Sequence, residues 1–388
     1  MRVCGIIAEY DPFHNGHLYH LTRAKEETGA DYMVCVLGCA FSQRGDPMLF
    51  QTFDRAEMAL RNGFDLVLGM PVSFSCAQAN RFARGGVGVL AALGAVTHLS
   101  FGCETDKQKW LHLAAHMLAN PDEAYKKALK DGLARGKSFA RAQGEALRDA
   151  LPDIPPVLLT SPNFILGISY LQELFRLKSA IIPVPVKREN PYHSKELNAL
   201  ASASAVRTAL LRGDWQAAAR AVPGASLELI MNAAREERMH KPEALDRALI
   251  AMLLKENGRA LLPSPEVSEG LELRVRATAR QASSRAELAA LVKTKRYPYA
   301  RINRALSHAL MEVSAYPASP SYARLLGLRR RAAPLLRAIS GARFPLVDKP
   351  ARSDCLGLDD DMHAEELWAL GAGLPVSSAW QARIRVVD

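Results

Sequence analysis

The chain has 388 residues, 49% of them apolar and 23% charged, a composition that fits a globular protein long enough for two domains. No apolar run reaches the roughly 18 residues of a membrane span, and the N-terminus meets Glu9 too early for a secretory leader, so we expect a cytoplasmic protein without membrane contact. The net charge is +10, and the six cysteines form no Cys-x-x-Cys pair, which disfavours a disulfide framework and a metal site.

The first half of the chain alternates short apolar runs with helical patterns. Strands are predicted at Val3–Ala8, Tyr32–Leu37, Asp65–Leu68, Val96–Phe101 and Ala180–Val186. Helices are predicted at Gly16–Glu27, about 54–62, Asn80–Leu93, two or three times within 106–150, at Asn163–Leu177, and from near Ser202. Strands separated by single helices are typical of right-handed βαβ units, so this half predicts an α/β fold with a doubly wound parallel sheet.

The second half is predicted to be almost entirely helical. Its candidate helices, separated by prolines, are Leu227–Glu237, Pro242–Glu256, Glu269–Gln281, Arg285–Val292, Tyr299–Val313 and Tyr322–Ile339. We therefore expect two domains, an α/β domain over residues 1–215 and a mostly α-helical one over residues 216–388.

The strongest chemical signal directly follows the first predicted strand. There the sequence Glu-Tyr-Asp-Pro-Phe-His-Asn-Gly-His-Leu places His14 and His17 at the start of a helix, with Gly16 between them. A helix N-terminus offers unpaired N–H groups and a partial positive charge to phosphate, and side chains three positions apart share one face. We predict that both histidines stabilise charge on the α-phosphate of ATP while pyrophosphate leaves. The alternative is a capped helix whose histidines lie on the surface.

A second helix start offers similar chemistry after the fifth predicted strand. Ser202 and Ser204 supply hydroxyl groups there, and Arg207 stands one turn further along. These residues could hold the β- and γ-phosphates, although ordinary N-capping also accounts for the serines. The sequence contains neither Gly-x-Gly-x-x-Gly nor a P-loop motif, which disfavours a Rossmann dehydrogenase and a P-loop kinase.

The positive charge is concentrated in one part of the second half. Residues 271–350 carry 16 basic and 4 acidic side chains, a net charge of +12, so the rest of the chain sums to −2. Within this segment Lys295, Arg296, Arg301 and Arg304 are interleaved with two tyrosines. Cations pair with phosphates and tyrosines stack on unpaired bases, so we predict RNA contact through these four residues. A solvated basic surface is the alternative.

With these residues identified, the chain resembles the bacterial tRNA(Met) cytidine acetate ligase family, a branch of the His-x-Gly-His nucleotidyltransferases. The likeness extends over nearly the whole length. The segments that carry it are Gly5–Leu18, Gln43–Pro47, Arg55–Leu60, Phe101–Glu104, Ser161–Asn163, Ile165–Gly167, Lys187–Arg188, Ala201–Arg207, Pro265–Glu272, Thr294–Tyr297, Ala300–Ile302 and Arg324–Gly327.

The resemblance implies a reaction in two steps. Acetate attacks the α-phosphate of ATP to give acetyl-adenylate and pyrophosphate, and N4 of the wobble cytidine of elongator tRNA(Met) then takes the acetyl group and releases AMP. It also implies a nucleotidyltransferase-like catalytic domain over residues 1–215 and tRNA binding by residues 216–388. Mg²⁺ is a candidate companion of ATP, and no protein partner is evident.

The resemblance further implies which residues contact ATP. They are Ile7, Ala8, Glu9, Tyr10, Asp11, Pro12, Phe13, His14, Asn15, Gly16, His17, Leu18, Tyr19, His20, Gly102, Asn163 and Arg188, to which we add Ser202, Ser204 and Arg207. The chain departs from the family pattern at Cys39, Ala40, Thr52 and Phe164. Two other functions therefore stay open, namely a small-molecule adenylyltransferase and a nucleotide- and RNA-binding protein without catalysis.

Overall fold

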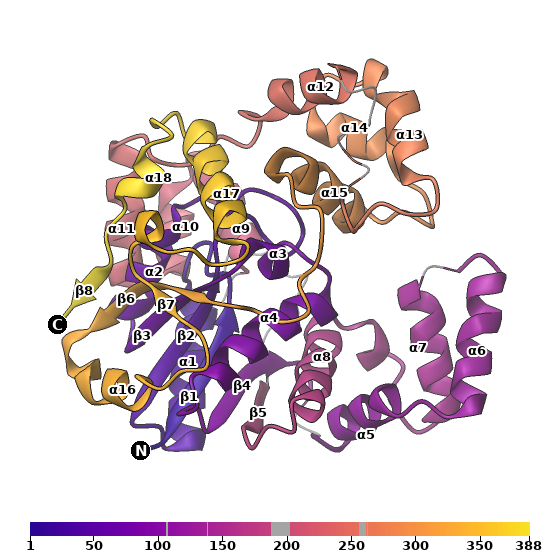
Figure 1. The fold of residues 1–388 in the computed structure, drawn as a ribbon, viewed down its shortest axis with the longest axis horizontal. Helices are drawn as coiled ribbons and strands as arrows, with labels where there is room; N and C mark the ends of the chain where they lie inside the picture. The colour runs from indigo at the N-terminus through magenta and orange to yellow at the C-terminus, as the bar shows by residue number, and fades with distance from the viewer. Residues whose placement is uncertain (106–107, 138, 188–201, 256–260, 262) are drawn as a thin grey trace.

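The computed structural model describes residues 1–105, 108–137, 139–187, 202–255, 261 and 263–388. Within these residues the strands form one mixed sheet, and helices cover both of its faces (Figure 1). The strands are β1 (Val3–Ala8), β2 (Tyr32–Gly38), β3 (Leu66–Met70), β4 (His98–Cys103), β5 (Ile182–Lys187), β6 (Ala323–Arg329), β7 (Leu346–Val347) and β8 (Arg385–Val387). Their order across the sheet is β5-β4-β1-β2-β3-β6-β7, and β8 pairs with β6.

The first five strands confirm the doubly wound parallel sheet that the sequence predicts. β1 lies between β2 and β4, and all neighbouring pairs among β1 to β5 are parallel. The chain runs outward from β1 through β2 to β3, and then crosses to the other side of β1 for β4 and β5. The direction of winding changes between β1 and β4, so the carboxyl ends of these two strands are where such a sheet opens a crevice.

Helices account for most of the remaining described residues. They are α1 (Asn15–Thr28), α2 (Thr52–Arg61), α3 (Val72–Ser75), α4 (Ala79–Ala92), α5 (Gln108–Ala119), α6 (Glu123–Ala134), α7 (Phe139–Ala150), α8 (Pro162–Arg176), α9 (Ala203–Leu211), α10 (Trp215–Ala221), α11 (Gly224–Arg235), α12 (Asp246–Lys255), α13 (Leu271–Thr278), α14 (Arg285–Val292), α15 (Tyr299–Met311), α16 (Ala333–Ala338), α17 (Leu358–Gly371) and α18 (Ser378–Gln381). α6 and α7 form a projecting hairpin, and α12 to α15 gather into a separate helical body (Figure 1). In the described part of the chain, no helix has both the length and the apolar composition needed to cross a bilayer.

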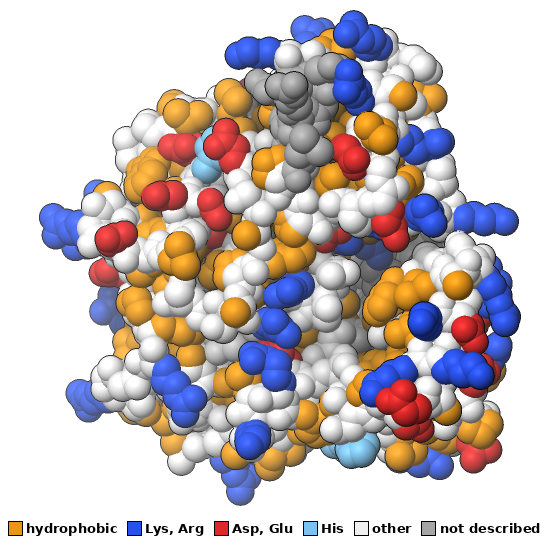
Figure 2. Space-filling model, turned by 45° about the vertical axis from the view of Figure 1, so that its right-hand side comes forward, with side chains coloured by type: hydrophobic (Ala, Val, Ile, Leu, Met, Phe, Trp, Pro, Cys, Tyr) orange, Lys and Arg blue, Asp and Glu red, His pale blue; other side chains and the backbone are white. Residues whose placement is uncertain are grey.

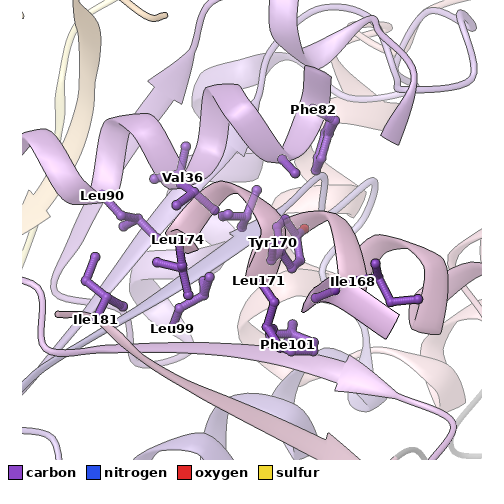
Figure 3. Close-up of a cluster of buried hydrophobic side chains, with 14 of the residues drawn as sticks. Val36, Phe82, Leu90, Leu99, Phe101, Ile168, Tyr170, Leu171, Leu174 and Ile181 are labelled. Atoms are coloured by element: carbon purple, nitrogen blue, oxygen red, sulfur yellow. The ribbon is translucent and has the colours of Figure 1, made fainter. Parts of the chain in front are cut away.

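One face of the sheet is covered by α4 and α8, which share its larger apolar core. Figure 3 shows Leu90 of α4 and Leu174 of α8 lying with Leu99 of β4 in this cluster. Gly86 lets α4 approach the sheet closely, since a Cβ atom there would lie 2.6 Å from Cδ1 of Ile7. Each fully buried Leu or Ile side chain contributes roughly 1.5–3 kcal/mol, so this packing fixes the position of β1 and β4 beneath the crevice.

The predicted helix over Tyr322–Ile339 is wrong in its first half. Ala323–Arg329 forms β6, which pairs antiparallel with β3, and a helix follows only at α16. The Leu and Arg residues of this segment favour a helix intrinsically, but the open edge of β3 supplies backbone partners and Leu326 becomes fully buried. The short strands β7 and β8 also belong to the sheet, so the last quarter of the chain is not purely helical. The division at residue 215 stays a prediction.

Candidate active site

A cavity of about 910 Å³ opens at the carboxyl ends of β1 and β4, where the winding of the sheet reverses. Its walls come from the end of β1, the first turn of α1, the ends of β4 and β5, the start of α9, and the loop 42–48. The predicted ATP residues that line it are Ile7, Ala8, Glu9, Tyr10, Asp11, His14, Gly16, His17, Tyr19, His20, Gly102, Asn163, Ser202, Ser204 and Arg207. Segments far apart in the sequence therefore meet in one cavity of nucleotide size.

The other predicted ATP residues are not part of the described lining. Phe13 is fully buried, and Leu18 packs against the same apolar cluster beneath α1. The Asn15 side chain donates a hydrogen bond of 3.0 Å to the carbonyl of Arg220, so it joins α1 to α10. Pro12 is likewise absent from the described lining, and Arg188 lies outside the described residues.

His14 and His17 are held in a fixed arrangement at the start of α1. His14 is the N-cap: its Nδ1 accepts a hydrogen bond of 3.0 Å from the backbone N–H of Gly16. The backbone N–H of His14 in turn lies 3.3 Å from Nδ1 of His17, and the two rings stack with centroids 3.6 Å apart. Because both Nδ1 atoms accept, each neutral ring carries its proton on Nε2. The cap therefore selects the tautomer in which both histidines are Nε2–H donors.

Asp11 and Arg207 join the motif to the second helix start. The Asp11 carboxylate accepts hydrogen bonds from the backbone N–H groups of Leu49 (2.9 Å) and Phe50 (3.0 Å). Arg207 donates to the Asp11 carbonyl at 2.7 Å, and its Nη1 lies 3.7 Å from the Asp11 carboxylate. The guanidinium group thus stands at the cavity with its orientation set by the backbone of the histidine motif.

Ser202 acts as the N-cap of α9, and its hydroxyl accepts from the backbone N–H of Ala205 at 3.3 Å. The simpler interpretation of this serine is therefore confirmed, and the same residue lines the cavity. Ser204 also lines the cavity and is exposed. The start of α9 consequently faces the space that a nucleotide would fill.

Two residues that sequence reasoning missed hold the site from behind. Glu104 caps α8: its carboxylate accepts from the side chain of Asn163 at 2.8 Å and from the backbone N–H of Phe164 at 2.9 Å. Arg55 is fully buried and donates to the carbonyls of Glu9 and Gly38, both at 2.7 Å, and of Phe50 at 3.0 Å. The available signal for Arg55 was a single cation on a helix face that is otherwise apolar.

The four departures from the family pattern lie around the cavity rather than in its described lining. Cys39, Ala40 and Phe164 are buried. Ala40 and Phe164 pack in apolar clusters, whereas Cys39 lies near the charged side chains of Arg324 and Glu365. The hydroxyl of Thr52 donates to Glu365 of α17 at 2.7 Å, so this residue ties α2 to the end of the chain. The departures therefore alter packing behind the site, while the histidine motif keeps its geometry.

The predicted RNA contacts divide into two groups. Lys295 and Arg296 are exposed, in the turn before α15. Arg301 donates to the carbonyl of Glu266 at 3.0 Å. Arg304 is only 9% exposed and pairs with the Glu266 carboxylate at 2.8 Å. The RNA contact predicted for Arg304 does not fit this position, because its guanidinium group is engaged inside the protein.

Basic side chains also occur on surfaces near this turn. Figure 2 shows Lys and Arg side chains on the α12–α15 body and on the lobe that carries α6 and α7, on either side of a hollow. Among the described residues, no group of three or more His, Cys, Asp or Glu side chains is arranged to hold a metal ion.

The fold and the histidine-capped helix define a class of protein. A profile of the family described as HIGH Nucleotidyl Transferase matches residues 1–379. The chain belongs to this family.

Individual relatives are similar over nearly the full length. The tRNA(Met) cytidine acetate ligase of Acetivibrio thermocellus is 36% identical over 367 residues, which cover 90% of this chain and 88% of that protein. The ligase of the same name from Clostridium perfringens is 33% identical over 390 residues, which cover 95% of each chain. The crystal structure of Thermotoga maritima TmcAL bound with alpha-thio ATP superposes with a TM-score of 0.89 at 31% identity, covering 95% of this chain and 94% of that one. The apo structure of the same protein gives a TM-score of 0.93 at 29% identity over the whole of both chains.

Proposed function

We propose that this chain is an ATP-dependent tRNA(Met) cytidine acetate ligase. The observation that carries the proposal is the first turn of α1, where His14 and His17 are fixed as Nε2–H donors beside a cavity of nucleotide size. The full-length likeness to proteins with this ligase name, one of them solved with an ATP analogue, supports the same activity.

The site chemistry supports adenylation of a carboxylate. An oxygen of acetate forms a bond to the α-phosphorus of ATP, the bond to the bridging oxygen breaks, and pyrophosphate leaves. Negative charge builds on the α-phosphate oxygens in the transition state, where the N-terminus of α1 and the His14 and His17 donors supply positive potential. Ser202, Ser204 and Arg207 at the start of α9 are proposed to hold the β- and γ-phosphates.

The second step transfers the acetyl group to RNA. The exocyclic amine of cytosine is a poor nucleophile and free acetate a poor electrophile, so a mixed anhydride supplies the missing activation. The exposed Lys295 and Arg296 on the α12–α15 body are the proposed phosphate contacts. The elongator identity of the tRNA, the participation of Mg²⁺, the division at residue 215 and a cytoplasmic location belong to the same proposal.

Acetate-dependent exchange of labelled pyrophosphate into ATP tests the first step. We expect exchange with the unaltered protein, and a loss of about 100- to 1000-fold in His17→Ala, the magnitude found when one preorganised transition-state donor is removed. His112→Ala is the matched control, because His112 is exposed on α5 and is not among the residues of the described cavity lining.

The outcome also separates the alternatives. A protein that binds ATP and tRNA but gives no exchange with acetate would be the non-catalytic binder and would contradict the ligase. Exchange that needs a phosphorylated metabolite in place of acetate would identify a small-molecule adenylyltransferase. Acetate-dependent exchange followed by acetylation of tRNA supports the ligase alone.

A further inference from the structure

Carboxylates line a cavity in which we propose that a triphosphate binds. The described lining includes Glu9, Asp11, Asp46 and Asp214. Like charges a few ångströms apart repel, so each of these acids costs ATP affinity unless it serves another purpose. An account of the site therefore has to explain why each acid is there.

Three of the four acids have structural partners. Asp11 is braced by two backbone N–H groups and Arg207, as described above. Asp214 caps α10, since its carboxylate accepts from the backbone N–H of Ala217 at 3.1 Å. Asp46 is exposed and accepts from the side chain of Asn303 at 3.2 Å. The fold explains these three acids without reference to a substrate.

Glu9 is different, because Asp46 and Asp214 are exposed to solvent, whereas the Glu9 side chain is half-buried and is held by a single hydrogen bond among the described residues. Its Oε1 accepts a hydrogen bond of 2.6 Å from the backbone N–H of Gln43. Across the part of the chain that the structure describes, no second hydrogen bond to this carboxylate is found. The backbone of Glu9 is fixed as well, since its carbonyl accepts from Arg55 at 2.7 Å. One carboxylate oxygen is thus anchored while the side chain borders the cavity.

The surroundings of Glu9 favour proton uptake. Burial raises the pKa of the Glu9 carboxyl above its ordinary value, the nearby Asp11 adds to this, and the Gln43 N–H, Arg207 of α9 and Arg55 of α2 lower the pKa in part. Tyr170 of α8 faces it as a neutral phenol, because burial raises the pKa of Tyr170. A carboxylate whose pKa is shifted toward neutrality is a better proton acceptor at physiological pH than an ordinary surface glutamate.

The two steps of the proposed reaction differ in their need for a base. Acetate is already ionised and attacks phosphorus without losing a proton. The cytosine N4 nitrogen carries hydrogens and must release one as it becomes an amide. A proton acceptor beside the cavity is therefore idle in the first step and required in the second.

We propose that Glu9 is the proton acceptor in acetyl transfer, an assignment that rests on the proposed ligase function. The bond from N4 to the acetyl carbon forms, the bond from that carbon to the phosphate oxygen breaks, and AMP leaves with the electron pair. The N4 proton passes to the Oε2 atom of Glu9 and then to solvent. Because Gln43 belongs to the loop 42–46 that packs on α15, the orientation of this base is set from the side of the molecule that carries the proposed RNA contacts.

The test uses the full chain and its Glu9→Gln variant. The amide oxygen of Gln can still accept from the Gln43 N–H, so the variant removes the base with little change in shape. Two rates are measured: acetate-dependent pyrophosphate exchange, and transfer from supplied acetyl-adenylate to bulk tRNA. We expect the ratio of transfer to exchange to fall about 100-fold or more, the lower range for loss of a general base. Asp214→Asn is the control, because Asn caps a helix as well as Asp does, and it should keep the ratio within twofold.

Two further readouts distinguish a base from a structural contact. Glu9→Asp should restore part of the transfer, since it returns a carboxylate one methylene shorter. The transfer rate of the unaltered protein should fall as the pH drops below the raised pKa of Glu9, and this dependence should vanish in Glu9→Gln.

The results that would overturn the assignment are specific. Equal losses of exchange and transfer in Glu9→Gln would make Glu9 an ATP contact, and a matching rise in the Mg²⁺ needed for exchange would make it a metal contact. Transfer at the unaltered rate would exclude it as the base. An unaltered protein without acetate-dependent exchange would instead remove the proposed function, and this assignment with it.

Discussion

At the scale of single residues, the site depends on a buried cation, Arg55, that is not part of the described cavity lining. Arg55 holds carbonyls at the ends of β1 and β2 from inside the protein. We expect Arg55→Met to lower the free energy of unfolding by at least about 3 kcal/mol, since each buried carbonyl left without a donor costs about 1–3 kcal/mol. Urea unfolding followed by circular dichroism measures this. Arg23→Met on the exposed face of α1 is the control, with a change of about 0.5 kcal/mol or less. Similar midpoints for the two variants would contradict the assigned role.

A second residue gives the protein a pH-dependent stability. Burial raises the pKa of the Asp361 carboxyl to about 7, in a cluster that includes Arg324 and Glu365. An unfolded Asp titrates near 3.9, so between about pH 4 and pH 7 the folded protein holds a proton that the unfolded chain has released. The contribution of Asp361 to the stability of the folded state therefore decreases as pH rises through this window.

Asp361→Asn should flatten that decrease. The amide oxygen can still accept from the Val72 backbone N–H, a bond of 2.6 Å in the structure, but the group no longer titrates. The measurement is the free energy of unfolding at several pH values between 4 and 8 for both proteins. Parallel curves across this range would show that Asp361 titrates normally.

At the scale of elements, the loop 42–46 is held by hydrogen bonds from the helical body. Arg285 of α14 donates to the carbonyl of Gly45 at 2.5 Å, and the hydroxyl of Ser307 donates to the same oxygen at 2.5 Å. Gly45 has φ of +90° and lies against the backbone of α15, where a Cβ atom would come within 2.5 Å of the Arg304 nitrogen. The loop 42–46, which forms one wall of the cavity, is thus positioned by helices that lie more than 200 residues later in the sequence.

Gly45→Ala should therefore weaken ATP binding as well as stability. The added Cβ atom displaces the loop from α15, and Gln43, Arg44 and Asp46 of this loop form part of the cavity wall. Gly94→Ala is the matched control, because Gly94 has φ of +71° with open space around its Cα, so it carries the backbone strain without the clash. We expect at least a tenfold rise in the Kd for ATP in Gly45→Ala alone, by isothermal calorimetry. Equal Kd values in both variants would mean that the loop does not shape the nucleotide site.

The sequence predicted those elements whose signals are local. The strands β1 to β5 could be predicted because each is a short apolar run between helical patterns. His14 and His17 could be predicted because both lie in the first turn of one helix. β6 was missed because its Leu and Arg residues favour a helix and only the distant edge of β3 makes them a strand. Glu104 was missed for a related reason, because its partners come from another segment. The lone cation on the face of α2 was the one local signal for Arg55, and it does not reveal the distant carbonyl of Glu9 that Arg55 holds.

At the scale of the whole molecule, the last quarter of the chain adds strands to one edge of the sheet. β6 covers the edge of β3, whose five residues are all buried, and Arg331 pairs with the buried Asp65 at the start of that strand. A chain that stops before β6 would expose β3 as a flat apolar edge, which is a template for aggregation. The described residues of the cavity lining all precede position 215. The strand β6, which pairs with β3 in the same sheet, is formed by residues beyond 322.

We therefore expect a chain ending at residue 321 to aggregate and to bind no ATP, although it keeps the whole described cavity lining. Size-exclusion chromatography and ATP binding measure this. The control is the full chain with a protease site inserted at Pro320, in the connection before β6, and cut there. The cut protein keeps every strand, so it should stay soluble with its two fragments associated. A monomeric, ATP-binding fragment 1–321 would show that β3 tolerates an open edge. The α/β part would then fold without its last strands, as a strict boundary near residue 215 requires.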